Sequence, residues 1–157
     1  MKENFFKEQY KQSWSFLKKS RYYIYLIIGI FFLFAFVGFV FPTPEILSKE
    51  IIKFIQELSE KTKGLGTFGL IKFIFLNNLQ SSFFGMMLGV FFGIFSVIFS
   101  IVNGYVLGFV AALVVGQEGI LVLWKLLPHG VFELPAIFIS LGLGMKFGSF
   151  VFKKNKS

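Results

Sequence analysis

The chain has 157 residues, of which 55% are hydrophobic and 20% aromatic, and its formal net charge is +8. A soluble domain of this length has no room to bury 25 phenylalanine side chains. The composition therefore predicts a polytopic membrane protein that folds as a single all-α helix bundle. The absence of cysteine excludes disulfides and thiolate metal sites.

The positive charge is concentrated at the two ends of the chain. Six basic residues precede the first long apolar run, and four lysines follow or close the last one. Basic segments that flank apolar spans are typical of cytoplasmic ends. We therefore expect a multi-pass protein of the cell (plasma) membrane with cytoplasmic N- and C-termini, and no nucleic acid partner.

Residues 1–21 predict a cytoplasmic amphipathic segment. Phe6, Tyr10, Trp14 and Leu17 recur at helical spacing, with lysines on the other side. This pattern fits a helix on an anionic inner leaflet and equally a solvated lead-in to the first span. Residues 22–157 form the transmembrane bundle domain. Its first span is 22–41, because about 20 apolar residues cross ~30 Å of hydrocarbon.

An amphipathic outer helix is expected over residues 44–63. Thr43 is the expected N-cap and Pro44 the first helical residue. The helix rests on the membrane or covers the bundle. The G-x-G-x-x-G that follows at 64–69 is interpreted as a connector, because neither a strand nor a suitably spaced acidic residue accompanies it.

The core bundle is expected over residues 68–152 and brings the number of transmembrane helices to about four. The second span is Phe83–Val102, and Asn103–Gly104 forms a tight turn. The third span begins with Tyr105–Val115 and is short. Either it includes residues before Asn103, or residues 120–127 return as a half-helix before the last span, Val131–Phe152.

Small residues recur every four positions in the last three spans, and such stripes let helix backbones approach closely in lipid. The alternative is the high glycine content of membrane helices in general. The first span lacks a stripe, so we expect it to pack outside the other three. The helix-packing residues are Gly85, Gly89 and Gly93 after Ser81, then Gly104, Gly108, Ala112 and Gly116, and finally Ala136, Ser140, Gly144 and Gly148.

A polar cluster is expected at the outer end of the bundle. His129 and Glu133 are one helical turn apart and share a face with the last small-residue stripe. We expect them to interact with Asn77 or Asn78, although a simple helix end at the lipid headgroups is the alternative. The remaining polar candidates are Gln80 at the outer end and Asn103, expected as a helix cap at the inner end.

The residue types argue against an enzyme. The chain has no aspartate and a single histidine, so a Ser-His-Asp triad is excluded and no catalytic residue is assigned. A zinc site at His129 and Glu133 would need Glu118 or a second subunit. We therefore expect neither a metal nor another cofactor.

Four elements of the sequence resemble the stage II sporulation protein M family from about Phe68 to the C-terminus. They are Asn77-Asn78, the Gly85/Gly89/Gly93 run, Asn103-Gly104-x-x-x-Gly108, and Leu127-Pro128-His129-Gly130-x-x-Glu133-Leu134-Pro135-Ala136. The resemblance implies a multi-span scaffold like the sporulation protein, which holds peptidoglycan-degrading partners at the septal membrane. The present chain has fewer spans than the five usual there and no large outer domain.

Two functions fit these features. The preferred one is a non-enzymatic membrane scaffold that organises partner proteins. The alternative is a small transporter or channel with an outer gate at His129 and Glu133. A dry, glycine-packed core favours the first, and a continuous polar path favours the second. The expected partners are the lipid bilayer and membrane or envelope proteins, with a homo-oligomer as a further option.

Overall fold

The protein is all-α in the computed structural model, which describes residues 2–41 and 43–154, without the side chains of residues 2–5, 91–92, 125–132 and 151–154. The all-α class is thus confirmed. Three segments with described side chains are long and apolar enough to cross a membrane, namely Phe6–Val40, Thr67–Val90 and Ile94–Glu118. The elements are α1 Lys2–Val40, α2 Glu45–Thr62, α3 Thr67–Phe92, α4 Ile94–Glu118, the 3-10 turn η1 Ile120–Val122, and α5 Leu123–Lys154.

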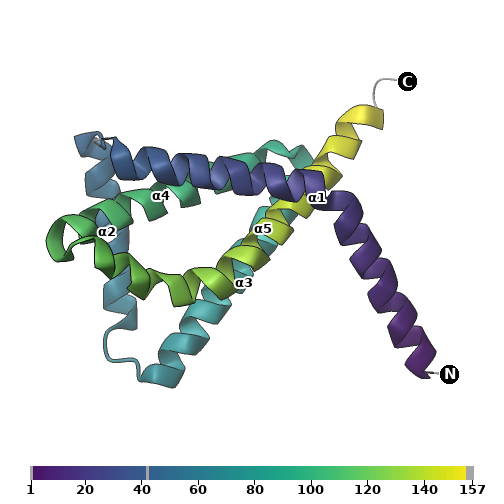
Figure 1. The fold of residues 1–157 in the computed structure, drawn as a ribbon, viewed down its shortest axis with the longest axis horizontal. Helices are drawn as coiled ribbons and strands as arrows, with labels where there is room; N and C mark the ends of the chain where they lie inside the picture. The colour runs from purple at the N-terminus through teal and green to yellow at the C-terminus, as the bar shows by residue number, and fades with distance from the viewer. Residues whose placement is uncertain (1, 42, 155–157) are drawn as a thin grey trace.

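The helix α1 joins the expected N-terminal segment and the first span without a break. It bends where the segment meets the bundle, and its first part points away from the other helices (Figure 1). The Ser20 hydroxyl donates a hydrogen bond of 2.7 Å to the Phe16 carbonyl one turn earlier. Such bonds back to the preceding turn bend helices. We call residues 2–20 the N-terminal arm.

The helix α2 begins one residue later than expected. Pro44 is its N-cap, and Ser48 donates its N–H to the Pro44 carbonyl. Thr43 is not the cap, because its Oγ1 accepts a hydrogen bond of 2.9 Å from the hydroxyl of Tyr105 in α4. Only Ile51 of α2 is buried.

The boundary between the second and third spans was predicted wrongly. The chain turns at Gly93, whose φ of +59° favours glycine, and not at Asn103–Gly104. The helix α4 therefore runs through Asn103 and has 25 residues, so the alternative in which the third span includes earlier residues is correct. No separate half-helix covers 120–127, because η1 leads directly into α5 at Leu123.

The helix α5 also begins earlier than the expected Val131. Its first part runs at an angle to its last part (Figure 1). Pro128 and Pro135 lie within it, and a proline inside a helix lacks the N–H of the regular hydrogen bond and produces a bend. After this bend, the second half of α5 runs along α3 and crosses α1 (Figure 1).

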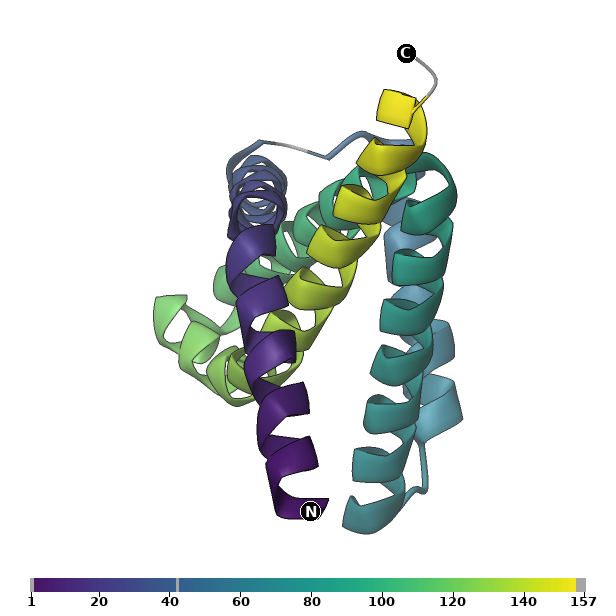
Figure 2. The ribbon, with the colours of Figure 1, turned by 90° about the vertical axis from the view of Figure 1, so that its right-hand side faces the viewer.

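The helices associate in two parallel pairs, α1 with α4 and α3 with α5. In the first pair, Gly104 and Gly108 of α4 approach Phe31 and Ala35 of α1 in the same order. In the second, Gly85 and Gly93 of α3 approach Leu141 and Gly148 of α5. Figure 2 looks roughly along the span of α1, with α3 standing apart from it and α5 between the two.

The core lies where α1 meets α5. It consists of Ile27, Phe31, Phe138 and Leu141, and the rings of Phe31 and Phe138 meet edge to face at 5.0 Å. The expectation that the first span packs outside is therefore wrong. Gly104 and Gly108 of α4 meet the backbone of α1, and Gly38 of α1 meets the backbone of α4, so the two helices approach closely without a regular stripe on α1.

Candidate functional site

A groove of about 490 Å³ opens between α3 and α5 and contains the largest group of predicted polar residues. We call it the α3–α5 groove. Asn78 and Ser82 line it from α3, and Glu133 and Ser140 line it from α5. Its apolar lining comes from Ile71, Ile74, Phe75, Leu79 and Ala136.

The groove brings together only part of the predicted outer cluster. Glu133 and Asn78 share its lining, but no hydrogen bond joins them among the described residues. Asn77 and Gln80 are exposed outside the groove. His129 lies in α5 one turn before Glu133, and its side chain is outside the described residues. Neighbouring residues of a helix point about 100° apart, so of the two asparagines only Asn78 faces α5.

Two serines add polar groups that the sequence analysis did not assign to this cluster. Ser82 was not singled out, although it follows Asn78 by four residues and so lies on the same face. Ser140 was expected to pack helices, and Ala136 likewise, but both line the groove. The four-residue spacing from Asn78 was the available signal for Ser82.

Asn103 is not the expected helix cap at the inner end. It lies inside α4 and is exposed, next to Gly104, which faces Phe31 of α1. Its Nδ2 donates a hydrogen bond of 2.7 Å to the Phe99 carbonyl one turn earlier. This bond satisfies part of the amide within the helix, so an asparagine is tolerated in an apolar span.

The predicted packing residues on α3 and α5 lie where the two helices meet. A Cβ atom on Gly89 would meet Ser96 Oγ and lie 3.0 Å from the Gly144 Cα. One on Gly85 would lie 2.7 Å from Leu141 Cδ2, and one on Gly148 would meet the backbone of Gly89 and Gly93. Gly89 and Gly148 face backbone atoms and therefore require glycine for the observed helix spacing, whereas the end of the Leu141 side chain can shift to accept a Cβ on Gly85.

Only part of the small-residue stripe of α4 contacts another helix. A Cβ atom on Gly104 or Gly108 would meet backbone atoms of α1, whereas one on Gly116 would meet nothing within 4 Å. Ala112 lines a smaller hollow with Gly38 of α1. The stripe thus contacts α1 through its first two glycines.

No group of three histidine, cysteine, aspartate or glutamate side chains lies together in the part of the chain whose side chains are described. The chemistry of the groove is that of hydrogen bonding and one carboxylate in an apolar setting. Such a surface suits the binding of another apolar molecule that carries polar groups.

The model of the family described as "Stage II sporulation protein M" matches residues 27–157. The chain belongs to this family. The match extends further toward the N-terminus than the expected start at Phe68, and includes most of the α1 span and all of α2. The N-terminal arm lies outside the match to the stage II sporulation protein M family. No curated protein and no solved structure matches the chain.

Proposed function

We propose that the protein is an integral membrane scaffold of the stage II sporulation protein M type, which organises partner proteins at the membrane. The observation that supports a scaffold is the apolar, closely packed interior. Ile27, Phe31, Phe138 and Leu141 fill the core, and glycine contacts close the helix pairs around it. A transporter or channel would need polar groups through this region.

The buried polar side chains do not form a connected path in the described part of the chain. They are Ser20, Ser96, Ser100 and Lys146. The Ser100 hydroxyl donates to the carbonyl oxygen of Ile27, and Lys146 donates to Ser20, seven residues earlier on α1. Among the described residues, no side-chain hydrogen bond links these two sites, which supports a static bundle rather than a polar path across the membrane.

The α3–α5 groove is the surface through which the scaffold engages a partner. Its volume of about 490 Å³ accommodates side chains of a transmembrane helix from an envelope protein. In lipid, small and hydrogen-bonding residues drive helix association, because burying apolar side chains gains little. Asn78, Ser82 and Ser140 supply these groups, and Glu133 selects a partner with a donor or a positive charge.

A matched pair of variants tests this function. Ser82→Leu fills the groove, whereas Ser81→Leu adds the same side chain at an exposed position of α3 outside the groove. We expect wild type and Ser81→Leu to co-purify from native membranes with the same stoichiometric envelope protein, and Ser82→Leu to lose it at unchanged thermal stability. Retention of the partner by Ser82→Leu, or purification of the wild type alone, would refute the proposal.

The transporter alternative is favoured by one observation, the Glu133 carboxylate in an apolar groove. In sealed liposomes a transporter would show pH-dependent ion flux that Glu133→Gln abolishes without unfolding the protein. The scaffold predicts the same low leak for wild type, Glu133→Gln and empty liposomes. A flux above that leak would favour the alternative.

A further inference from the structure

The N-terminal arm carries an exposed aromatic row. Phe6, Tyr10 and Trp14 follow one another at four-residue spacing, and their exposed fractions are 68%, 73% and 53%. Residues at this spacing lie on one face of a helix. Tyrosine and tryptophan are enriched where a membrane meets water, because each combines an apolar ring with a polar O–H or N–H group. The row is thus suited to the headgroup region of a bilayer.

A basic row runs beside the aromatic one. Lys7, Lys11 and Lys18 are exposed, and the ammonium group of Lys18 lies 5.9 Å from the ring centroid of Trp14. Within residues 1–21 the chain has six basic residues and two glutamates. The arm therefore presents a positive and aromatic surface, which is the composition of helices that bind anionic membranes.

Contacts with α5 hold the arm in its direction. Lys146 is 8% exposed, and its Nζ donates a hydrogen bond of 2.9 Å to Ser20 Oγ and lies 4.2 Å from the ring centroid of Phe16. The Phe16 ring also stacks on Phe147 with the centroids 5.8 Å apart. These contacts lie at the bend of α1, so they fix the angle between the arm and the span.

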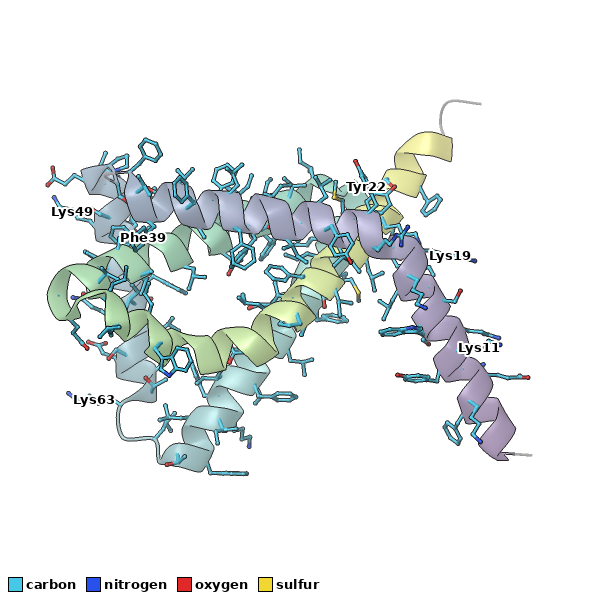
Figure 3. The ribbon with its side chains drawn as sticks, in the orientation of Figure 1. Lys11, Lys19, Tyr22, Phe39, Lys49 and Lys63 are labelled. Atoms are coloured by element: carbon cyan, nitrogen blue, oxygen red, sulfur yellow. The ribbon has the colours of Figure 1, made fainter. Side chains whose placement is uncertain are left out.

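The bend at this junction determines how the arm lies relative to the apolar span of α1. The arm ends where the apolar span of α1 begins, and it bends away from that span (Figure 3, with Lys11 and Lys19 on the arm and Tyr22 on the span). A basic amphipathic segment that bends away from a membrane span at its end is suited to the membrane surface. Its nearest ligand is the lipid headgroup layer on that side.

We propose that the N-terminal arm binds a leaflet rich in anionic phospholipids. The aromatic row inserts among the headgroups, and Lys7, Lys11 and Lys18 extend to the lipid phosphates. Long lysine side chains reach charged headgroups while their methylene stems stay on apolar surface. A basic amphipathic segment prefers anionic to zwitterionic lipid for electrostatic reasons, and salt weakens the preference.

Fluorescence of Trp14 in the full-length protein tests this proposal. The chain has two tryptophans, so Trp124→Phe leaves Trp14 as the single emitter. The protein is placed in lipid nanodiscs of phosphatidylcholine alone, or of phosphatidylcholine and phosphatidylglycerol in equal amounts. We expect a blue-shifted emission and about a twofold lower quenching constant for acrylamide in the anionic discs, both reversed by high salt.

Two triple variants separate a local site from net charge. Lys7→Gln/Lys11→Gln/Lys18→Gln removes the basic row, whereas Lys49→Gln/Lys53→Gln/Lys61→Gln removes three exposed lysines from α2. We expect the first to lose the response to phosphatidylglycerol and the second to keep it, with equal thermal stability. Equal quenching in both kinds of disc, or equal loss in both variants, would overturn the proposal. Protection of Trp14 only in native membranes would instead assign the arm to a protein partner.

Discussion

Ser100 in α4 donates a hydrogen bond of 2.9 Å to the carbonyl oxygen of Ile27 in α1. Both residues are fully buried. Ser96 lies one turn earlier on α4 and is equally buried, but its Oγ has no hydrogen-bond partner among the described residues. The two serines lie on the same helix and are equally buried, so they differ mainly in the hydrogen bond that only Ser100 makes.

The serine pair provides the first prediction. Ser100→Ala removes a hydrogen bond between helices and should lower the free energy of unfolding by about 1 kcal/mol. Ser96→Ala removes an unsatisfied hydroxyl and should leave stability unchanged or raise it slightly. Reversible denaturation of the purified protein in detergent measures both. Equal losses would show that the Ser100 bond contributes nothing of its own.

The second prediction concerns α4. Gly108→Ala would place its Cβ against the Ala35 carbonyl, and overpacking of this kind typically costs ~1–3 kcal/mol. Gly116→Ala meets nothing within 4 Å and should be neutral or stabilising by up to ~1 kcal/mol, because alanine favours helix more than glycine does. The difference in melting temperature between these two variants is the measurement. Similar values would mean that α1 and α4 do not pack as described.

The third prediction tests the position of α1 itself. Gly38→Ala would meet the Tyr105 carbonyl of α4, whereas a Cβ on Gly29 has no neighbour within 4 Å. A first span packed outside the bundle would tolerate both changes. We expect Gly38→Ala alone to lower the melting temperature, by an amount comparable to Gly108→Ala. If Gly38→Ala is as stable as Gly29→Ala, the span lies elsewhere.

The fourth prediction is topological, and the absence of cysteine makes it simple to test. Cytoplasmic termini and four crossings predict that a cysteine at Ser13 is shielded from an impermeant label in intact cells. A cysteine at Ser59, in the outer helix α2, should react. A cysteine at Ser157 should be shielded like the one at Ser13. Labelling of position 157 from outside would require an odd number of crossings.

Several features of the fold were predictable because they depend on local pattern. The helix α1 ends at Val40, close to the expected Phe41, and α2 ends at Thr62, close to the expected residue 63. The prediction of a turn at Asn103–Gly104 was wrong. This dipeptide favours turns in water, but in an apolar span the backbone keeps its helical hydrogen bonds. The actual turn at Gly93 looked like any other member of the small-residue stripe.

The partners of each helix were less predictable. A small-residue stripe shows that a helix face can be approached closely but does not show which helix approaches it, so the pairing of α4 with α1 was missed. In the candidate site, the shared groove of Glu133 and Asn78 depends on the register between α3 and α5. Helical spacing in the sequence predicts which residues share a face of one helix, but it does not predict which residues of two helices lie opposite each other.

The two parallel pairs also constrain how the protein is made. The closest partner of α1 is α4, and that of α3 is α5, so another spanning segment is synthesised between the members of each pair. When a ribosome-bound chain has completed α3, it contains α1 and α3 but not yet their partners α4 and α5. Neither of the two pair contacts can therefore have formed. Its helices must therefore remain in the bilayer as separate inserted segments until α4 and α5 arrive, and the bundle closes only near the end of translation.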